Sequence, residues 1–181
     1  LCFLNNDVEV LHAGWLTEMV EQALREGIGA VGAKLYYPDG TVQHAGVVVG
    51  LRGVADHSHK GFSGADSGYF MRLKIVQEYS AVTAACMVIR RDAFEAVGGF
   101  DAEHLEVIFN DVELCLRLRE AGLRNVWTPY AELRHHESAT RRKLLRGNPV
   151  LKRNANWMRR HRSIALARDP YWNPALSLRH Y

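Results

Sequence analysis

The sequence predicts an α/β domain in which a mixed β-sheet is flanked by helices. Apolar residues recur at helical spacing between Trp15 and Leu24, and a β-branched strand pattern follows in residues 28–37. Polar clusters far apart in the chain each stand where an apolar run stops. Because open α/β sheets place ligands beyond the carboxyl ends of their strands, these clusters are expected to build one site.

The first predicted elements are a strand, a helix and a hairpin. Residues 1–4 form an apolar run that is expected to be a buried strand of a parallel sheet. The helical pattern of residues 15–24 stops before Gly27, which is typical of a helix C-terminus. The strand that follows is joined by a turn at residues 38–40 to a β-rich return over residues 41–50, which indicates a hairpin.

Residues 52–70 are rich in glycine and poor in large aliphatic side chains, which predicts a long mobile loop. His57 and His59 lie in it. Loops of this kind are often lids or binding loops, so both histidines are candidates for contact with an acceptor or a metal. The alternative is a solvated loop in which neither histidine meets a ligand.

A long apolar segment, residues 75–90, predicts a strand, and Asp92 is expected to cap a short helix after it. Gly98 and Gly99 end that helix. Glycine allows backbone geometries that are closed to other residues, so Gly99 is a candidate for close approach by an acceptor sugar. A helix stop followed by a turn explains Gly98 equally well.

The next predicted helix begins at Asp111 and ends before Gly122. Asp111 has two interpretations. As a structural N-cap, its carboxylate accepts backbone hydrogen bonds at the positive end of the helix dipole. As a functional group, an exposed carboxylate at the start of a helix can meet a substrate.

Residues 124–128 and 131–135 predict two short strands, separated by Pro129 as a breaker. His135 and His136 lie at the polar end of the second strand. Imidazole is a common ligand of transition metals, and a carboxylate together with a histidine suits Mn²⁺ when diphosphate oxygens complete the shell. The alternative is a structural or surface pair, and the sequence leaves open which histidine points inward.

The segment Leu4-Asn5-Asn6-Asp7-Val8-Glu9-Val10 resembles the short acidic metal motif of family 2 glycosyltransferases with the nucleotide-sugar-binding A-type fold. Three further segments resemble that family in the same order, so the resemblance spans about residues 1–140 and is closest to rhamnosyltransferases. They are residues 83–101, like the acceptor-side strand and glycine turn; residues 110–118, like the segment of the catalytic base; and residues 135–140, like the carboxy-terminal histidine motif.

The resemblance implies a partial A-type fold and inverting transfer of a sugar, rhamnosyl or a similar hexosyl, from a nucleotide-diphosphate sugar. The acceptor would be a hydroxyl of a saccharide or lipid-linked molecule in cell-surface polysaccharide or glycolipid synthesis. Asp111 is implied as the catalytic base, and Asp7 and His135 as ligands of a divalent metal, Mn²⁺ or Mg²⁺. The remaining implied contacts are Asn5, Asn6 and Asp7 with the donor diphosphate, and Gly99, Asn110 and Glu113 with the acceptor, while His136, His57 and His59 are further candidates.

Two positions depart from the family pattern. Asn5 and Asn6 stand where the fuller Asp-x-Asp motif has its first acid, so the site carries less negative charge and the metal requirement stays open. Asn110 replaces the acid that often precedes the base, which removes a like-charged neighbour of Asp111. Glu113 is either a secondary partner of the acceptor or a surface residue.

Composition limits the class of protein. With 181 residues, 48% hydrophobic and 24% charged, the chain has the size of one globular domain and is neither disordered nor fibrous. Three cysteines without CxxC spacing indicate reduced thiols in a cytoplasmic protein. No apolar run approaches the roughly 20 residues that cross a bilayer. The chain opens inside an apolar strand without Met, so residues 1–140 are interpreted as a fragment lacking an amino-terminal nucleotide-binding half.

Residues 141–181 carry eleven Lys or Arg against one acid, Asp169, for a net charge of +10, while the rest of the chain carries −7. This segment is expected to be a basic helical extension that makes peripheral contact with anionic lipids at the inner face of the membrane. A solvated helical face is the alternative. A second function also follows, an inactive glycosyltransferase-like domain whose basic tail binds membranes or anionic polymers. Nucleic acid is not an expected partner, since no nucleic-acid motif accompanies the charge.

Overall fold

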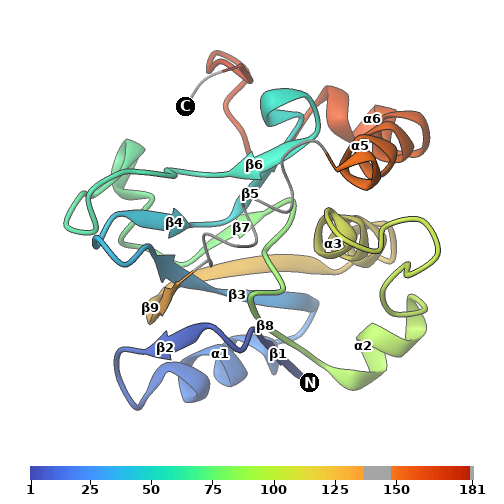
Figure 1. Ribbon diagram of the computed structural model, residues 1–181. Coiled ribbons are helices and arrows are strands. Elements are labelled where there is room, and N and C mark those ends of the chain that lie inside the picture. The colour runs from blue at the N-terminus through green and yellow to red at the C-terminus, as the bar shows by residue number, and fades with distance from the viewer. Residues whose placement is uncertain (137–147, 180–181) are drawn as a thin grey trace.

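The computed structural model describes residues 1–136 and 148–179. Within these stretches the centre of the molecule is a seven-stranded mixed sheet (Figure 1). Its middle strands, β3 (Ile28–Tyr36) and β9 (Arg124–His135), pair in parallel, and the other pairings are antiparallel. The strand order is β1-β8-β3-β9-β2, where β1 is Cys2–Leu4, β8 is Cys86–Ile89 and β2 is Val8–Val10; β4 (Val42–His44) also pairs with β3, and β7 (Gln77–Tyr79) with β9.

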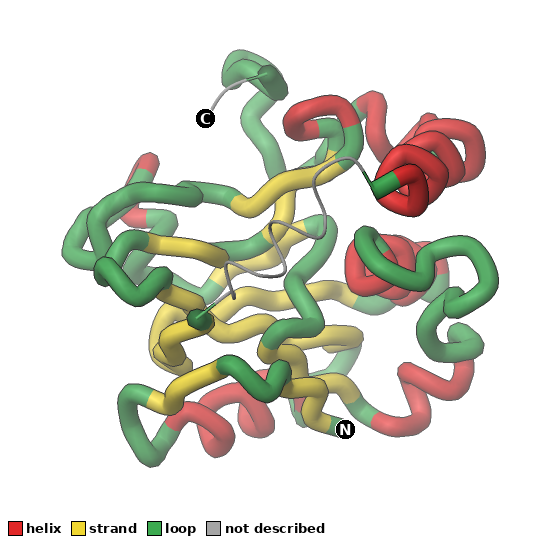
Figure 2. The backbone as a smooth tube through the Cα atoms, in the orientation of Figure 1, coloured by secondary structure: helices red, strands yellow, loops and turns green. Residues whose placement is uncertain are grey.

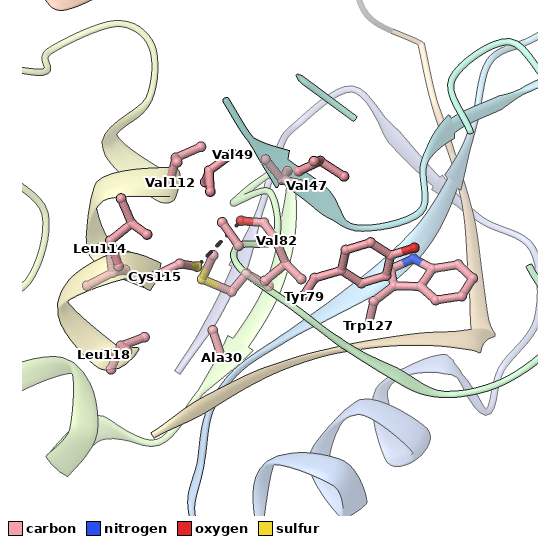
Figure 3. Packing of buried hydrophobic residues seen from close by; sticks show 14 of the residues in the cluster. Ala30, Val47, Val49, Tyr79, Val82, Val112, Leu114, Cys115, Leu118 and Trp127 are labelled. Atoms are coloured by element: carbon pink, nitrogen blue, oxygen red, sulfur yellow. Dashed lines mark hydrogen bonds between the residues drawn. The ribbon is translucent and has the colours of Figure 1, made fainter. Parts of the chain in front are cut away.

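Helices cover both faces of the sheet, which confirms the predicted fold class. Helix α1 (Trp15–Ala23) packs on one face through Met19. Helix α3 (Asn110–Glu120) and the hairpin of β5 (Val47–Val49) and β6 (Ala55–His57) lie on the other face (Figures 1 and 2). Figure 3 shows this second core, where Val49 of the hairpin lies beside Val112 of α3 and Cys115 contacts the Val82 carbonyl.

Several predicted elements are found where the pattern placed them. Helix α1, strand β3 and its hairpin with β4 match the prediction, and so does α2 (Arg91–Ala96) before the two glycines. Gly122 follows α3 with a φ of +83°. Strand β3 is buried along nearly its whole length. Its apolar pattern is therefore strong enough to specify both the strand and its central position.

Two strand predictions were wrong about how the strands pair or how far they extend. Residues 2–4 do form a strand, but β1 is an antiparallel edge strand whose residues are exposed or half-buried, because β8 is its one partner among the described residues. The segment 75–90 is not one strand. Its first part, β7, pairs with β9, whereas β8 lies between β1 and β3, and residues 80–85 connect the two.

Further corrections concern a loop, a proline and two caps. The expected loop over residues 52–70 contains strand β6, which pairing with β5 stabilises. Pro129 does not break β9, because the register with β3 shifts there and the resulting bulge accommodates a residue without an N–H. Asp92 and Asp111 are not the N-cap residues: Arg90 and Phe109 hold those positions, and both acids lie in the first turn.

The carboxy-terminal segment packs on the domain as helices α5 (Pro149–His161) and α6 (Ser163–Ala167), which confirms its predicted helical character. The side chain of Asn154 is fully buried, and its amide donates to the carbonyl of His104 at 2.7 Å. Asp169 is also buried and accepts from the Val49 N–H and the Ser80 hydroxyl, both at 2.8 Å. Arg141, Arg142, Lys143 and Arg146 of the basic segment lie outside the described residues.

None of the described helices combines the length and the apolar character that a membrane span requires.

Gly46, between β4 and β5, turns the chain toward the hairpin that carries His57. Its φ is +88°, and a Cβ there would lie 2.3 Å from the Tyr79 ring, whereas Gly40, with a φ of +82°, has open space. We expect Gly40→Ala to cost about 1–2 kcal/mol of unfolding free energy from its backbone alone. Gly46→Ala should cost about 1–3 kcal/mol more, because the methyl group overpacks the core. Urea denaturation measures both, and equal losses would contradict the close approach.

Candidate active site

An open cleft of about 400 Å³ lies where segments far apart in the sequence meet. Its walls come from the end of β1, the chain before β8, the start of α3, the end of β9, and β6 with the turn after it. The polar side chains of this lining are Asn5, Asp56, His57, Lys60, Thr83, Asn110, Asp111 and His135. The expectation that distant polar clusters build one site is therefore met for Asn5, Asn110, Asp111 and His135.

Asp111 lies in the first turn of α3 with its half-buried carboxylate at the cleft. One oxygen accepts from the Ala84 N–H at 3.1 Å and the other from its own helix at the Val112 N–H, at 2.9 Å. The residue before the helix, Phe109, has a φ of +65°, an unusual conformation that turns the chain sharply into α3. These two backbone donors fix the direction of the carboxylate, which lies at the positive end of the helix.

His135 is buried at the end of β9, and both of its ring nitrogens have partners. Nδ1 is 2.7 Å from Oε1 of Gln43, an oxygen that can only accept, so the tautomer with its proton on Nδ1 fits this contact. Nε2 then has a lone pair, which faces the Asn5 amide nitrogen at 3.2 Å and Oδ1 of Asp7 at 3.0 Å. Two lone-pair atoms held this close, Nε2 and Oδ1, need a proton or a cation between them.

This arrangement fits one side of a divalent metal site. The imidazole donates from its other nitrogen to an amide oxygen, as ligating histidines usually do, and the adjacent carboxylate is partly exposed. Among residues 1–136 and 148–179, no three His, Cys, Asp or Glu side chains are grouped to hold a metal ion. Asp7 and His135 would therefore bind a metal together with substrate oxygens, as Mg²⁺ sites commonly do.

The other candidates from the first motif and the histidine pair lie apart from the cleft. His136 is exposed, and its Nε2 lies 3.2 Å from Oε2 of Glu9. Asn6 is also exposed and does not line the cleft. The difference between the histidines agrees with extended backbone, in which successive side chains point to opposite sides: His135 ends β9 and His136 follows it. The rest of the histidine motif, residues 137–140, lies outside the described residues.

Gly99 and Glu113 are placed away from the cleft as well. Gly99 has a φ of +68°, and a Cβ there would lie 3.0 Å from the Phe94 ring, so the turn after α2 accounts for this glycine. Glu113 is 2% exposed and pairs with Arg117, at 2.7 Å, and with Arg162. A buried carboxylate with two guanidinium partners has a structural role here, because it joins α3 to the segment between α5 and α6.

Of the two histidines in the predicted loop, one lines the cleft and the other does not. His57 lines the cleft beside His135. His59 is fully buried, and its Nδ1 lies 2.8 Å from the Ser58 hydroxyl. The two side chains point to different surroundings because β6 ends at His57 and the chain turns after it.

The residues at or behind the cleft that sequence reasoning missed include Gln43, His44, Asp56 and Lys60. Gln43 and His44 are polar residues inside a buried strand, and that contrast is a signal that could have found them. Lys60 gives no comparable signal, since a lysine in a polar loop is ordinary. Its place at the cleft follows from the fold of the β5–β6 hairpin.

The family model described as glycosyltransferase like family 2 matches residues 4–159, most of the chain. The chain belongs to this family. The match begins at the first polar motif and ends within α5, so it contains every residue that lines the cleft. It confirms the family inferred from the four sequence motifs.

Curated relatives extend the likeness to nearly the whole chain. The uncharacterized protein y4gI of Sinorhizobium fredii is 52% identical over 180 residues, and the O-antigen biosynthesis protein RfbC of Myxococcus xanthus is 45% identical over 186; each alignment covers 98% of this chain. A shorter stretch of 57 residues, 32% of the chain, is 40% identical to the N-acetylglucosaminyl-diphospho-decaprenol L-rhamnosyltransferase of Mycobacterium tuberculosis. The alignments cover 20%, 14% and 18% of these relatives, so the chain spans a fifth or less of their length.

Burial of His59 makes folding sensitive to pH. Desolvation, helped by the positive charge of Arg72, lowers the pKa of His59 from about 6.5 to about 4. Below pH 6.5 the unfolded chain binds a proton at this position that the folded chain does not, so the free energy of unfolding falls as the pH decreases toward 4. For this one group the loss at pH 5 is about 2 kcal/mol.

We therefore expect His59→Gln to reduce the loss of unfolding free energy between pH 7 and pH 5 by about 2 kcal/mol. The exposed His161 supplies the control variant, His161→Gln. Urea denaturation at the two pH values gives the comparison, and an identical pH dependence in both variants would contradict a neutral, buried His59.

Proposed function

We propose that this glycosyltransferase family 2 chain is the metal-side and acceptor-side part of an inverting enzyme. The enzyme transfers a hexosyl group, such as rhamnosyl, from a nucleotide-diphosphate sugar to a hydroxyl of a saccharide or lipid-linked acceptor in surface polysaccharide synthesis. The observation that carries this proposal is that Asp111 and His135, the latter in contact with Asp7, line one cleft. The names of two relatives, in O-antigen biosynthesis and rhamnosyl transfer, support the same class of product.

Asp111 is the proposed general base. The acceptor oxygen attacks the anomeric carbon, the bond from that carbon to the diphosphate breaks, and its electron pair leaves with the nucleoside diphosphate. The hydroxyl proton passes to Asp111, whose carboxylate retains lone pairs beyond those bound by the Ala84 and Val112 N–H groups. Attack opposite the leaving group inverts the anomeric centre.

Asp7 and His135 are proposed to hold Mn²⁺ or Mg²⁺ beside the donor diphosphate. When bound, the metal supplies positive charge that stabilises the leaving diphosphate. Gln43 fixes the His135 ring so that Nε2 faces Asp7, and Asn5 contacts the same nitrogen. Asn5 and Asp7 therefore stay proposed donor-side residues, while Asn110 at the cleft stays a proposed acceptor contact.

We also place the enzyme in the cytoplasm, with residues 1–140 as its catalytic part and the basic segment from residue 141 at the inner face of the membrane. A shallow hollow on α5 supports that contact, since Lys152, Arg153 and Arg160 line it together with Trp157. Basic side chains around an aromatic ring suit an anionic lipid surface. An inactive domain that only binds such surfaces is the alternative, and detectable sugar transfer excludes it.

Asp111→Asn should reduce sugar transfer by a factor of about 10²–10⁴ in the full-length protein, because the amide cannot take the hydroxyl proton. Binding of nucleoside diphosphate should change less than twofold, since Asp111 lies on the acceptor side. Transfer is measured with a panel of nucleotide-diphosphate sugars and a saccharide acceptor. Asp92→Asn, an identical change at an exposed side chain of α2, is the control. Full activity of the Asp111 variant would rule out a base at this position.

The neighbouring histidines give a matched test of the metal site. His135→Ala should weaken Mn²⁺-dependent binding of nucleoside diphosphates by about tenfold or more, whereas His136→Ala should leave it unchanged, because His136 pairs with Glu9 at the surface. Calorimetry on this chain with a panel of nucleoside diphosphates, with and without Mn²⁺, measures both. Equal effects of the two substitutions would remove His135 from the site.

A further inference from the structure

A second, smaller hollow of about 100 Å³ adjoins the cleft and shares five lining residues with it: His57, Lys60, Thr83, Ala85 and His135. Among the described residues its lining includes one ammonium group, Lys60, and no carboxylate. The other polar side chains of the lining are Tyr37, Gln43 and Thr83. The space is too small for a sugar and a nucleoside together, but it can hold one compact anionic group.

We propose that this hollow binds a phosphate group of a diphosphate-bearing substrate through Lys60 and His57, and that buried His44 positions His57 for this contact. The proposal rests on the proposed function for the identity of that substrate. It assigns roles to three residues outside the four motifs.

The donor chemistry of the walls favours an oxyanion. Because Oε1 of Gln43 accepts from Nδ1 of His135, the part of this amide that remains to serve a ligand is its NH₂ group, a donor. Nζ of Lys60 lies 3.5 Å from Oδ1 of Asp56, and Oδ2 of the same carboxylate pairs with Nη1 of Arg52 at 3.2 Å. These three charges sum to +1, so an anion beside Lys60 meets net positive charge.

The proton arrangement of two histidines supports a second donor at His57. Nδ1 of the fully buried His44 lies 2.7 Å from Nδ1 of His57, so one of these two nitrogens carries a proton. Nε2 of His44 accepts from the Thr83 N–H at 3.5 Å, which places the His44 proton on Nδ1. His57 then accepts at Nδ1 and carries its own proton on Nε2. Burial keeps the pKa of His44 well below its usual value, which agrees with a neutral ring.

The position of the hollow indicates which phosphate it meets. It shares His135, the contact of Asp7, with the main cleft, whereas Asp111 lines the cleft alone. The hollow is therefore on the metal side of the reacting sugar, away from the proposed base. That side belongs to the leaving nucleoside diphosphate. Because the metal motif lacks its first acid, it is expected to hold a cation less firmly. Lys60 would then supply part of the positive charge that faces the diphosphate.

The direct test is binding of inorganic pyrophosphate to the folded chain by calorimetry in EDTA, which removes any metal contribution. Lys60→Ala should weaken binding about tenfold, as expected for loss of a charge-assisted hydrogen bond. Lys74→Ala removes the same charge at a half-buried lysine that lines neither the cleft nor the hollow, and it should change binding less than twofold. Equal losses in both variants, or none in Lys60→Ala, would overturn the proposal.

Competition then identifies the source of the phosphate. Displacement of pyrophosphate by nucleoside diphosphates assigns the hollow to the leaving group, and displacement by a short isoprenyl diphosphate assigns it to a lipid-linked acceptor. Displacement by neither would overturn a substrate subsite. Asp111→Asn should still bind pyrophosphate. If pyrophosphate binding depends on Lys60 but the full-length protein transfers no sugar, the proposed function fails and the subsite stands. If sugar is transferred but binding does not depend on Lys60, the subsite fails and the proposed function stands.

The role of His44 has its own spectroscopic test. Long-range ¹H–¹⁵N spectra should show His57 protonated at Nε2 in the wild-type chain. His44→Leu should give mixed His57 tautomers and weaken pyrophosphate binding, whereas His44→Asn, which keeps a donor near Nδ1, should restore the Nε2 form. An unchanged His57 tautomer in folded His44→Leu would remove His44 as a positioning residue.

Discussion

One buried amide ties together the elements on which the cleft depends. The side chain of Asn125, fully buried on β9, accepts from the Ala30 N–H at 3.3 Å and donates to the carbonyls of Ser80 and Cys115, at 3.0 and 2.9 Å. Through these bonds the strand that ends at His135 is fixed to β3, to the chain before β8 and to α3. Because an amide buried without partners is costly, these elements hold one relative position, and Asp111 and His135 keep theirs.

The carboxy-terminal segment also helps to hold these elements in position, through contacts with α3 and the β5–β6 hairpin. Glu113 of α3 is buried between Arg117 and Arg162, and Asp169 accepts from both the hairpin and the chain after β7. A buried carboxylate is tolerated only when it is fully paired, so removal of either arginine would leave an expensive charge. The helices after residue 148 thus stabilise the helix that carries Asp111, and they are more than a charged appendage.

Elements that depend on the local sequence pattern could be predicted from the sequence. Features that depend on which strands pair, or on contacts between distant segments, could not. The apolar runs of α1, β3 and α3 specify those elements, whereas the family resemblance was needed to choose Asp111 and His135 as site candidates. Pro129 was misjudged because the bulge that accommodates it exists only opposite β3. Lys60 and His44 were missed because β6 folds back on β5 through contacts that no local pattern encodes. Gly99 and Glu113 look like site residues in the motifs, but their partners are Phe94 and Arg162.

The asparagine in the metal motif changes how the cleft handles charge. An acid at Asn5 would place a second carboxylate against Nε2 of His135, where Asp7 already stands at 3.0 Å, and would raise the demand for a bound cation. The amide instead offers a donor to that nitrogen. Nε2 of His135 therefore faces one carboxylate, Asp7, rather than two. Under the proposed function, a diphosphate at this side would meet the Asn5 amide and the Lys60 ammonium as protein donors, and a metal held by Asp7 and His135 would add its positive charge to theirs.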